Sequence, residues 1–353
     1  DDVTRKTPTK VILPLLLEKL REHRISKDQI NIVIALGSHR PMTEKEIKQK
    51  VGEEIFKTYQ IINSEFRDKS KMSSLGFTDD GIEIWVDKRV VQSDLKIGIG
   101  NIVPHPAVGW SGGGKIIYPG VAGEDTVARF HFLHGSIPWN MYGQEDNPVR
   151  IEMEKWVNKV GLHFIVNTIL TPAGDIYGVV GGDYVKAHRK GVEIAKHVYG
   201  IKTQSLFDIV VVSSYPADVD FWQATKGVLA GDHILEDGGI LILFTPCYEG
   251  VGPHPEYLYY CGYDSPDNLL EEIKNFASEE MLTASVGITI SRIAQRKKLF
   301  LVSGGIGEEE AKVGGFEYFY SLEDALREAL RLKGENARIG FVPYGGKTFA
   351  YTV

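Results

Sequence analysis

A glycine-rich segment ending in a lysine has the clearest chemical potential in this sequence of 353 residues. From His105 to Gly120 it is HPAVGWSGGGKIIYPG, in which four glycines and Ser111 precede Lys115. Backbone N–H groups left accessible by glycine can cradle a phosphate, and a lysine beside them can bind or join an anionic group. The alternative is a tight surface turn with an exposed lysine. The crowding of small residues before Lys115 favours the ligand site.

The same segment matches the phosphate-binding loop pattern GxxxxGK over Gly109–Lys115. Enzymes that use this loop on nucleotides need a serine or threonine directly after the lysine to hold magnesium, whereas this chain has Ile116. A phosphotransferase built on the loop therefore stays an alternative, and Ile116 counts against it.

Two histidines lie where an acid–base group would be useful. The β-branched run INIVIALG predicts a buried strand, and His39 follows it after one residue. His105 stands between Pro104 and Pro106, which restrict the backbone on both sides. An unperturbed imidazole titrates near neutral pH, so either ring could exchange a proton with a substrate. The alternative for each is a structural histidine.

The side chains available for a metal are histidines rather than cysteines. His131 and His134 are spaced i and i+3 in a predicted helix and can face the same side, although helix histidines are more often simply hydrogen-bonded. The only cysteines, Cys247 and Cys261, lack a CxxC spacing and cannot form a thiolate metal site alone. A metal would be held by imidazole, carboxylate or the atoms of a cofactor.

Polar residues at two predicted helix starts could hold an anionic substrate. Asp2 and Arg5 precede the first predicted helix, and an arginine can grip a carboxylate through two parallel hydrogen bonds. Gln223 and Lys226 lie one turn apart at the start of a later helix. The simpler interpretation of all four is a set of capping or solvated side chains.

The order of predicted elements indicates an α/β protein with two α/β domains. The run LFDIVVVSSYP, the helix FWQATKGVLAGDHIL and the strand GGILILFTPC form a strand–helix–strand unit typical of parallel sheets. We expect an N-terminal domain over residues 1–202 and a Rossmann-like C-terminal domain over 203–345. The last residues, 346–353, have strand composition and are expected to join the first domain.

Two local predictions are specific enough to check. Thr43 and Glu46 are spaced as a capping box before a helix that Gly52 ends. Pro14 is expected in the first turn of a helix over 11–23, where proline is tolerated.

Composition restricts the class of partner. The net charge is −7 and the longest basic run is Arg296–Lys298, so we expect neither nucleic acid nor an anionic membrane as partner. No apolar stretch approaches the roughly 20 residues of a membrane helix, and no signal peptide is visible, so a cytoplasmic location is expected. The chain opens at Asp1 without a methionine, and an N-terminal segment is expected to be missing.

Several motifs occur in an order that resembles one family. They are DVTR at 2–5, ALGSHR at 35–40, HPAVGWSGGGKIIYPG, His131, and QATK at 223–226. This order is similar to that of the nickel-pincer lactate racemases, which racemise or epimerise 2-hydroxy acids. The resemblance implies two α/β domains with a cofactor and substrate cleft between them, the second domain closing over the substrate.

The resemblance also implies a role for each motif residue. Lys115 resembles the lysine linked covalently to the cofactor, a pyridinium-3,5-bisthiocarboxylic acid mononucleotide that grips nickel through sulfur, ring carbon and sulfur. His131 resembles the protein ligand of nickel, with His134 as the alternative, and His39 and His105 resemble two bases on opposite sides of the substrate. The other implied positions are Ser111, Gly112, Gly113 and Gly114 at the cofactor, Arg5, Gln223 and Lys226 at the substrate, and Asp2 orienting the site.

The implied reaction removes the α-hydrogen of a 2-hydroxy acid as hydride and passes through a planar 2-keto acid. Two bases, one for each enantiomer, are then expected, and a cofactor that supplies sulfur accounts for the lack of spaced cysteines. The enzymes that build the cofactor are the implied partners.

Two departures from the family pattern bear on the substrate pocket. Trp222 stands where the lactate enzymes are expected to have tyrosine, and ASVG at 284–287 where a substrate-facing tryptophan is expected. They leave a larger 2-hydroxy acid open beside lactate. A sensor that binds a mononucleotide or a 2-hydroxy acid without turnover is the remaining alternative.

Overall fold

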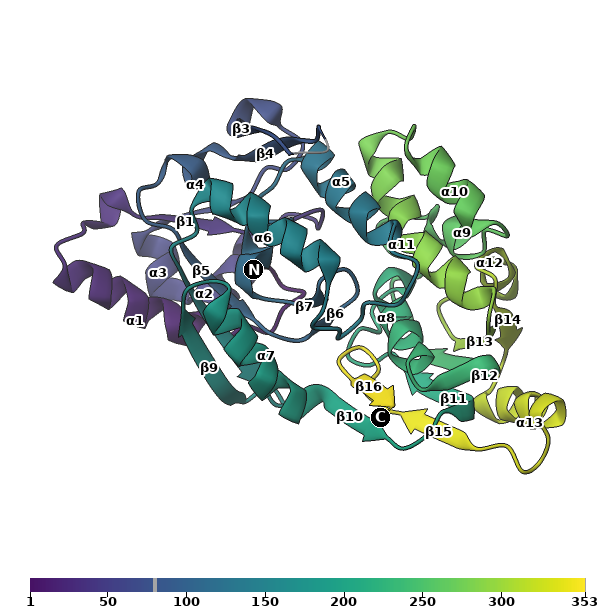
Figure 1. The fold of residues 1–353 in the computed structure, drawn as a ribbon. Helices are drawn as coiled ribbons and strands as arrows, with labels where there is room; N and C mark the ends of the chain where they lie inside the picture. The colour runs from purple at the N-terminus through teal and green to yellow at the C-terminus, as the bar shows by residue number, and fades with distance from the viewer. Residues whose placement is uncertain (79–80, 353) are drawn as a thin grey trace. The chain divides into compact units, whose positions relative to one another are not determined.

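The computed structural model describes residues 1–78 and 81–352, and its chain divides into two compact units (Figure 1). Both units contain helices and sheets, so the predicted α/β class is confirmed. Unit 1 comprises Asp1–Val103, Ser111–Phe130 and Pro148–Val198, and unit 2 comprises Pro104–Trp110, His131–Asn147 and the chain from Tyr199 onward. The domain limits taken from the sequence stay a prediction beside this division.

Unit 1 consists of small sheets and the helices around them. Its strands are β1 (Asn31–Ile34), β2 (Gln60–Asn63), β3 (Met72–Phe77), β4 (Glu83–Asp87), β5 (Ile97–Asn101), β8 (Phe164–Leu170) and β9 (Ile176–Gly182). β5 pairs in parallel with β8, which forms an antiparallel hairpin with β9; β1 pairs in parallel with β2, and β3 antiparallel with β4. Its helices are α1 (Thr9–Glu22), α2 (Glu44–Val51), α3 (Glu53–Thr58), α4 (Lys88–Gln92), the first part of α5 (Glu124–Gly135), α6 (Pro148–Val160) and α7 (Lys186–Tyr199).

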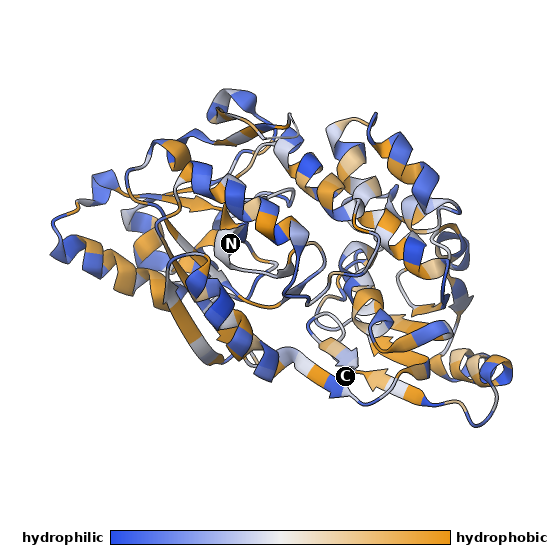
Figure 2. Cartoon of the chain, in the orientation of Figure 1, coloured by the Kyte–Doolittle hydropathy of each residue, from blue (hydrophilic) through white to orange (hydrophobic). Residues whose placement is uncertain are grey.

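Helices α1 and α2 bury their apolar sides in one cluster of unit 1. Leu13 and Leu17 of α1 contact Ile47 and Val51 of α2, together with Ile34 of β1. Figure 2 shows the alternation of hydrophobic and hydrophilic positions along α1. Because this packing uses one face of each helix, the position and rotation of α2 are fixed.

One of the two local helix predictions is confirmed and the other is wrong. Thr43 and Glu46 form the capping box of α2, and Gly52 ends the helix with φ +93°. Pro14 does not lie in the first turn of α1. The helix begins at Thr9, directly after Pro8, so Pro14 falls in the second turn, where it removes one helical hydrogen bond.

Unit 2 is built on a parallel five-stranded sheet. The strands of unit 2 as a whole are β6 (Pro104–His105), β7 (Gly109–Trp110), β10 (Gly200–Thr203), β11 (Phe207–Ser213), β12 (Leu235–Thr245), β13 (Lys298–Ser303), β14 (Glu317–Phe319), β15 (Ile339–Val342) and β16 (Phe349–Thr352). Five of them, β11 to β15, form this sheet. The sheet order is β14-β13-β12-β11-β15, and neighbouring strands are parallel. Strands β12, β13 and β14 are added in turn on one side of β11, and β15 is then added on its other side. This change in the order of strand addition is typical of doubly wound, Rossmann-like folds. The strand expected at the end of the chain is β16, which pairs in parallel with β10.

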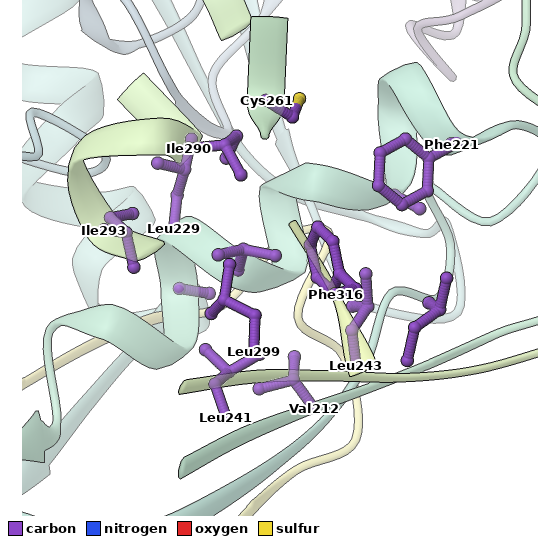
Figure 3. Close-up of a cluster of buried hydrophobic side chains, with 14 of the residues drawn as sticks. Val212, Phe221, Leu229, Leu241, Leu243, Cys261, Ile290, Ile293, Leu299 and Phe316 are labelled. Carbon is purple, nitrogen blue, oxygen red and sulfur yellow. The ribbon is translucent and has the colours of Figure 1, made fainter. Parts of the chain in front are cut away.

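Helices cover both faces of this sheet. They are α8 (Phe221–Asp232), α9 (Tyr257–Cys261), α10 (Pro266–Ile273), α11 (Ser278–Ala294), α12 (Glu308–Val313) and α13 (Leu322–Lys333). Val210 and Val212 face a core shared with α8 and α11, part of which is drawn in Figure 3, whereas Ile209 and Val211 face α13. Successive residues of a strand point to opposite faces, so these continuous apolar runs suit a sheet buried on both sides.

Within residues 1–78 and 81–352, none of the helices has both the length and the apolar character required to span a membrane.

Candidate active site

The first turn of the chain holds a buried carboxylate. Asp2 is 3% exposed. One of its carboxylate oxygens accepts from the N–H and the hydroxyl of Thr4 (3.2 and 2.6 Å), and the other accepts from Nδ1 of His39 (2.6 Å). Burial by itself would raise the pKa of Asp2, but the hydrogen bond and charge of His39 and the charge of Arg5 hold that pKa well below its usual range. Asp2 is therefore a fixed anion at neutral pH.

His39 receives a defined tautomer from this carboxylate. It lies in the turn after β1, where its N–H donates to the carbonyl oxygen of Leu36 (3.2 Å). Because Nδ1 donates to an ionised carboxylate, the neutral ring carries its proton on Nδ1 and has its lone pair on Nε2. The side chain is 32% exposed, so a ligand can reach it. Asp2 and His39, 37 residues apart in the sequence, form a carboxylate–imidazole pair suited to a general base.

The glycine loop after β5 packs closely on the rest of unit 1. Gly112 and Gly113 have φ values of +79° and +61°, in the left-handed region that favours glycine. A Cβ at Gly112 would come within 2.7 Å of Asn167, and one at Gly113 within 2.9 Å of His188. At Gly114 it would meet the side chain of Val157 at 2.8 Å. These glycines are therefore required for packing against β8, α7 and α6.

Buried polar side chains fix the backbone of the loop. The hydroxyl of Ser111 donates to the carbonyl oxygen of Asn101 (2.8 Å) and accepts from the N–H of Val103 (2.9 Å). Asn167 accepts from the N–H of Gly113 (2.7 Å), and Nε2 of His188 donates to the carbonyl oxygen of Ser111 (2.9 Å). The Ser111 hydroxyl is thus engaged within the protein. Its role at a cofactor, like that of Gly112–Gly114, stays a prediction.

Lys115 ends the loop in a cationic environment. Burial lowers the pKa of Lys115 to about 7, and the charges of Arg5 and Arg150 act in the same direction, while Asp2 opposes them. At that pKa about half of the amine is neutral at pH 7, compared with well under 1% for a lysine of ordinary pKa. Lys115 consequently has the lone pair that a nucleophilic amine needs.

An ion cluster behind the loop adds positive charge. The buried Arg150 lies 3.4 Å from the carboxylate of Glu154, and Arg189 binds the same carboxylate at 2.7 Å. Two arginines thus share one carboxylate. Arg189 also donates to Nδ1 of His188 (3.1 Å), so His188 is a neutral ring connecting this cluster to the loop.

In unit 2, His105 is held by the backbone. It ends β6, which pairs with β7 in a short antiparallel ladder. Its Nδ1 accepts from the N–H of Ala107 (3.2 Å), so the neutral ring carries its proton on Nε2. This is the opposite tautomer from that of His39.

The two histidines of α5 have different environments. His134 is buried, and burial together with the charges of His131 and Arg292 lowers its pKa to about 3, which keeps it neutral. His131 is only partly buried. Among the described residues, no group of three or more His, Cys, Asp or Glu side chains is placed to hold a metal ion. A metal at His131 would therefore need most of its ligands from elsewhere.

Gln223 and Lys226 meet at the start of α8. Asp220 caps this helix by accepting from the N–H of Gln223 (2.7 Å), and the Lys226 ammonium donates to the side-chain oxygen of Gln223. The neighbouring Trp222 packs its ring 4.6 Å from those of both His254 and Tyr257. The amide and the ammonium are thus held together, and their predicted role in binding an anionic substrate stays a prediction.

The predicted site residues fall into two groups. Unit 1 contains Asp2, Arg5, His39, Ser111, Gly112, Gly113, Gly114 and Lys115, and unit 2 contains His105, His131, Gln223 and Lys226. The structure joins Asp2 to His39 and Gln223 to Lys226 by hydrogen bonds.

The sequence did not indicate Lys50, Arg150 or His188. Each is one of several polar residues in an amphipathic helix pattern, where a polar side chain is usually exposed to solvent. Lys50 and His188 make contacts with residues distant in the sequence, and Arg150 pairs with Glu154 four residues later, a spacing that does not by itself indicate a buried site.

Comparison with known proteins supports one family over nearly the whole chain. The model of the lactate racemase N-terminal domain matches residues 1–140, and that of the C-terminal domain matches residues 202–348. A lactate racemase of Thermoanaerobacterium thermosaccharolyticum is 30% identical over 351 residues, which are 98% of this chain and 82% of that protein. A lactate racemase of Lactiplantibacillus plantarum is 28% identical over 355 residues, with the same coverage of 98% and 82%.

Solved structures agree with this assignment. The lactate racemase apoprotein of T. thermosaccharolyticum matches with a TM-score of 0.90 and 29% identity, over 99% of this chain and 84% of that one. A Thermotoga maritima protein shares the fold, with a TM-score of 0.76 and 20% identity over 100% of this chain and 92% of that one. The family expected from the motif order is confirmed: this chain belongs to the lactate racemase family.

Proposed function

We propose that this protein racemises or epimerises a 2-hydroxy acid, lactate or a related larger acid, by reversible hydride transfer to a nickel-pincer nucleotide linked to Lys115. Its similarity to two lactate racemases supports the reaction class. The observation that carries the proposal is the Asp2–His39 pair, a base held in its proton-accepting tautomer, in the same unit as a lysine with a pKa of about 7.

The surroundings of Lys115 fit an anionic mononucleotide with a carboxyl-derived arm. A neutral amine can condense with the thiocarboxyl group of such an arm to give a thioamide and water, and burial leaves about half of this amine neutral at pH 7. Arg5 and Arg150 contribute positive charge around it, and Glu154 is shared between Arg150 and Arg189. The excess of positive charge suits the phosphate of a nucleotide.

The side chains available to a metal fit a cofactor that brings its own sulfur. Cys247 and Cys261 are both buried, and the metal ligand implied by the family resemblance is a single imidazole, His131. A nickel ion would need more donors than one imidazole, and the thiocarboxyl groups of the cofactor would supply soft ones. When bound, this cofactor would supply a reversible acceptor for hydride.

The residues of unit 1 would start the reaction. Nε2 of His39 takes the proton of the substrate hydroxyl as the α-hydrogen leaves as hydride, and the product of this step is a planar 2-keto acid. Asp2 stabilises the imidazolium that forms, and it keeps Nδ1 as the donor throughout. Arg5 binds the substrate carboxylate.

The residues of unit 2 would complete the reaction. Hydride return to the other face of the 2-keto acid creates an alkoxide, and His105 supplies its proton from a doubly protonated ring. Gln223 and Lys226, which are joined by a hydrogen bond, would hold the oxygen atoms of the substrate. In the reverse direction the two histidines exchange roles.

The test uses protein made together with the enzymes that build the cofactor. Intact mass and peptide mapping locate an adduct, metal analysis measures nickel, and chiral chromatography follows D- and L-lactate and larger 2-hydroxy acids labelled with deuterium at the α-carbon. We expect an adduct on Lys115, one nickel per chain and racemisation with the deuterium retained.

Three results would contradict the proposal. Loaded protein that racemises no 2-hydroxy acid would leave the sensor as the better interpretation. Loss of deuterium to solvent would point to a carbanion instead of hydride transfer. An unmodified chain from a host shown to make the cofactor, together with ATP binding in the presence of magnesium, would favour the phosphotransferase.

A further inference from the structure

Lys50 binds the N-terminal segment through three contacts. From α2, its Nζ donates to the carbonyl oxygens of Asp2 (2.9 Å) and Arg5 (3.0 Å) and lies 3.0 Å from the carboxylate of Asp1. The side chain is 10% exposed, and burial lowers the pKa of Lys50 to about 8. Two of the three N–H donors of the ammonium group thus bind backbone oxygens, and its charge is paired with the Asp1 carboxylate.

The two carbonyl groups belong to residues that the proposed function uses. Asp2 and Arg5 lie in one turn, closed by a hydrogen bond from the N–H of Arg5 to the carbonyl oxygen of Asp2 (3.3 Å). Residues 1–8 precede α1 and belong to no helix or strand. They therefore have no backbone ladder to hold them, and Lys50 binds both ends of the turn.

Lys50 projects from a helix that is itself fixed. Ile47 and Val51 are buried in the cluster shared with α1 and β1, and Thr43 and Glu46 cap the start of α2. A side chain on such a helix can transmit a fixed position to the turn that it binds. This also explains why a lysine is buried at an energetic cost: its partners are backbone oxygens and a carboxylate, which compensate the ammonium.

We propose that Lys50 is a positioning residue for racemisation, which holds the Asp2–Arg5 turn so that Asp2 keeps the Nδ1–H of His39 and Arg5 stays in place for the substrate. This inference rests on the proposed function for its catalytic consequence. Its structural part, the control of the His39 tautomer by Lys50, can be measured without substrate or cofactor.

The first experiment follows the His39 ring by ¹⁵N NMR in the cofactor-free protein. Lys50→Met removes the three contacts, and Lys45→Met is the matched control, because Lys45 is an exposed lysine on the same helix. We expect the neutral ring to be the Nδ1–H tautomer in the wild type and in Lys45→Met, and a mixture with the Nε2–H tautomer in Lys50→Met. In an Asp2→Asn background, Lys50→Met should cause no further change in the ring spectrum.

The second experiment measures kinetics with loaded protein. Lys50→Met should keep the Lys115 adduct and its nickel but lower kcat by on the order of 10- to 100-fold and raise KM, because a small displacement of a supporting group is costly in an active site. Lys50→Arg, which keeps the charge and several donors, should restore most of kcat. If Lys50→Met does not fold, Lys50→Gln, which has no charge and a shorter side chain ending in an amide, takes its place in both experiments.

The outcomes separate this inference from the proposed function. A folded Lys50→Met protein with an unchanged His39 spectrum overturns the positioning role, even if its Tm falls, because Lys50 would then only stabilise the fold. An altered spectrum with unchanged kcat and KM overturns its catalytic consequence. Wild-type protein that racemises nothing refutes the proposed function, while the ring spectrum still decides whether Lys50 positions Asp2.

Discussion

The two candidate bases differ in what holds them. Asp2, 37 residues away in the sequence, holds the ring of His39, whereas the backbone N–H of Ala107, two residues away, holds that of His105. A carboxylate accepts and an amide donates, so the neutral rings carry their protons on opposite nitrogens. Nε2 of His39 therefore has a lone pair that can accept a proton, whereas Nε2 of neutral His105 carries an N–H that can donate a hydrogen bond. The chain thus distinguishes two residues of the same type by their partners alone.

The two lysines of the candidate site show a similar contrast. Lys115 lies near Arg5 and Arg150, and its pKa of about 7 suits a nucleophile. Lys226 instead donates to the side-chain oxygen of Gln223, an arrangement that suits a binding group. The neighbouring arginine charges therefore suit Lys115 to covalent attachment, and the neutral amide of Gln223 suits Lys226 to substrate binding.

Replacing each lysine in turn tests this contrast and should have the largest effect on activity. Lys115→Ala should abolish cofactor attachment and all racemisation, because it removes the amine to which the proposal links the cofactor. Lys226→Met should keep the adduct and its nickel and lose substrate binding. Intact mass spectrometry, nickel analysis and chiral chromatography on both variants check this. A Lys115→Ala protein that still carries cofactor and nickel would refute the attachment.

Removing either base should cost less than removing Lys115. His39→Ala and His105→Ala should each lower kcat/KM by about 10²–10⁴, the loss expected for an acid–base group. The fall must be equal for both enantiomers of a simple racemate, because they have the same free energy at equilibrium. Initial rates from each enantiomer give the measurement. Unchanged activity in one variant would remove that histidine from the mechanism.

The Asp2–His39 pair should also appear in the pH dependence of stability. The folded pKa of Asp2 is lowered, so its contribution is fully present above the unfolded value of about 3.9 and is lost as the pH falls through the folded value. Asp2→Asn should lower the free energy of unfolding by about 1–3 kcal/mol at pH 6, with the difference shrinking below about pH 4.

Urea unfolding of both proteins between pH 3 and 7 measures this difference. A difference that is constant across this range would mean that Asp2 is not held as an anion by His39. Equal stability at pH 6 would mean that the pair adds nothing to folding.

The smallest effect concerns the reactivity of the Lys115 amine. In cofactor-free protein, its rate of acetylation should rise through pH 7 and level off above about pH 8, because the neutral fraction follows a pKa of about 7. Arg5→Met removes one of the neighbouring charges and should raise that pKa, slowing acetylation at pH 7 by a few-fold. Peptide mapping with Lys45 as an internal reference measures both rates. A Lys115 rate that keeps rising to pH 10 would contradict the lowered pKa.

Predictions based on short segments succeeded where the deciding contacts are local. The capping box of α2 depends on two residues that are three apart, Thr43 and Glu46. The prediction for Pro14 failed because the start of α1 depends on Pro8, which the apolar pattern alone does not reveal. The sequence predicted a ligand site at the glycines of the loop. The structure shows that Gly112 and Gly113 are also needed for close packing on Asn167 and His188, which the sequence did not indicate.

The sequence by itself determined the kinds of group present, the local helices and strands, and a motif order specific enough to identify the family. The tertiary structure decided what those groups can do. The depressed pKa of Lys115, the tautomer of His39 and the binding of Lys50 to the Asp2–Arg5 turn all depend on burial and on neighbours distant in the chain. Electrostatic and hydrogen-bond energies follow distance in space and solvent access, which only the folded chain defines.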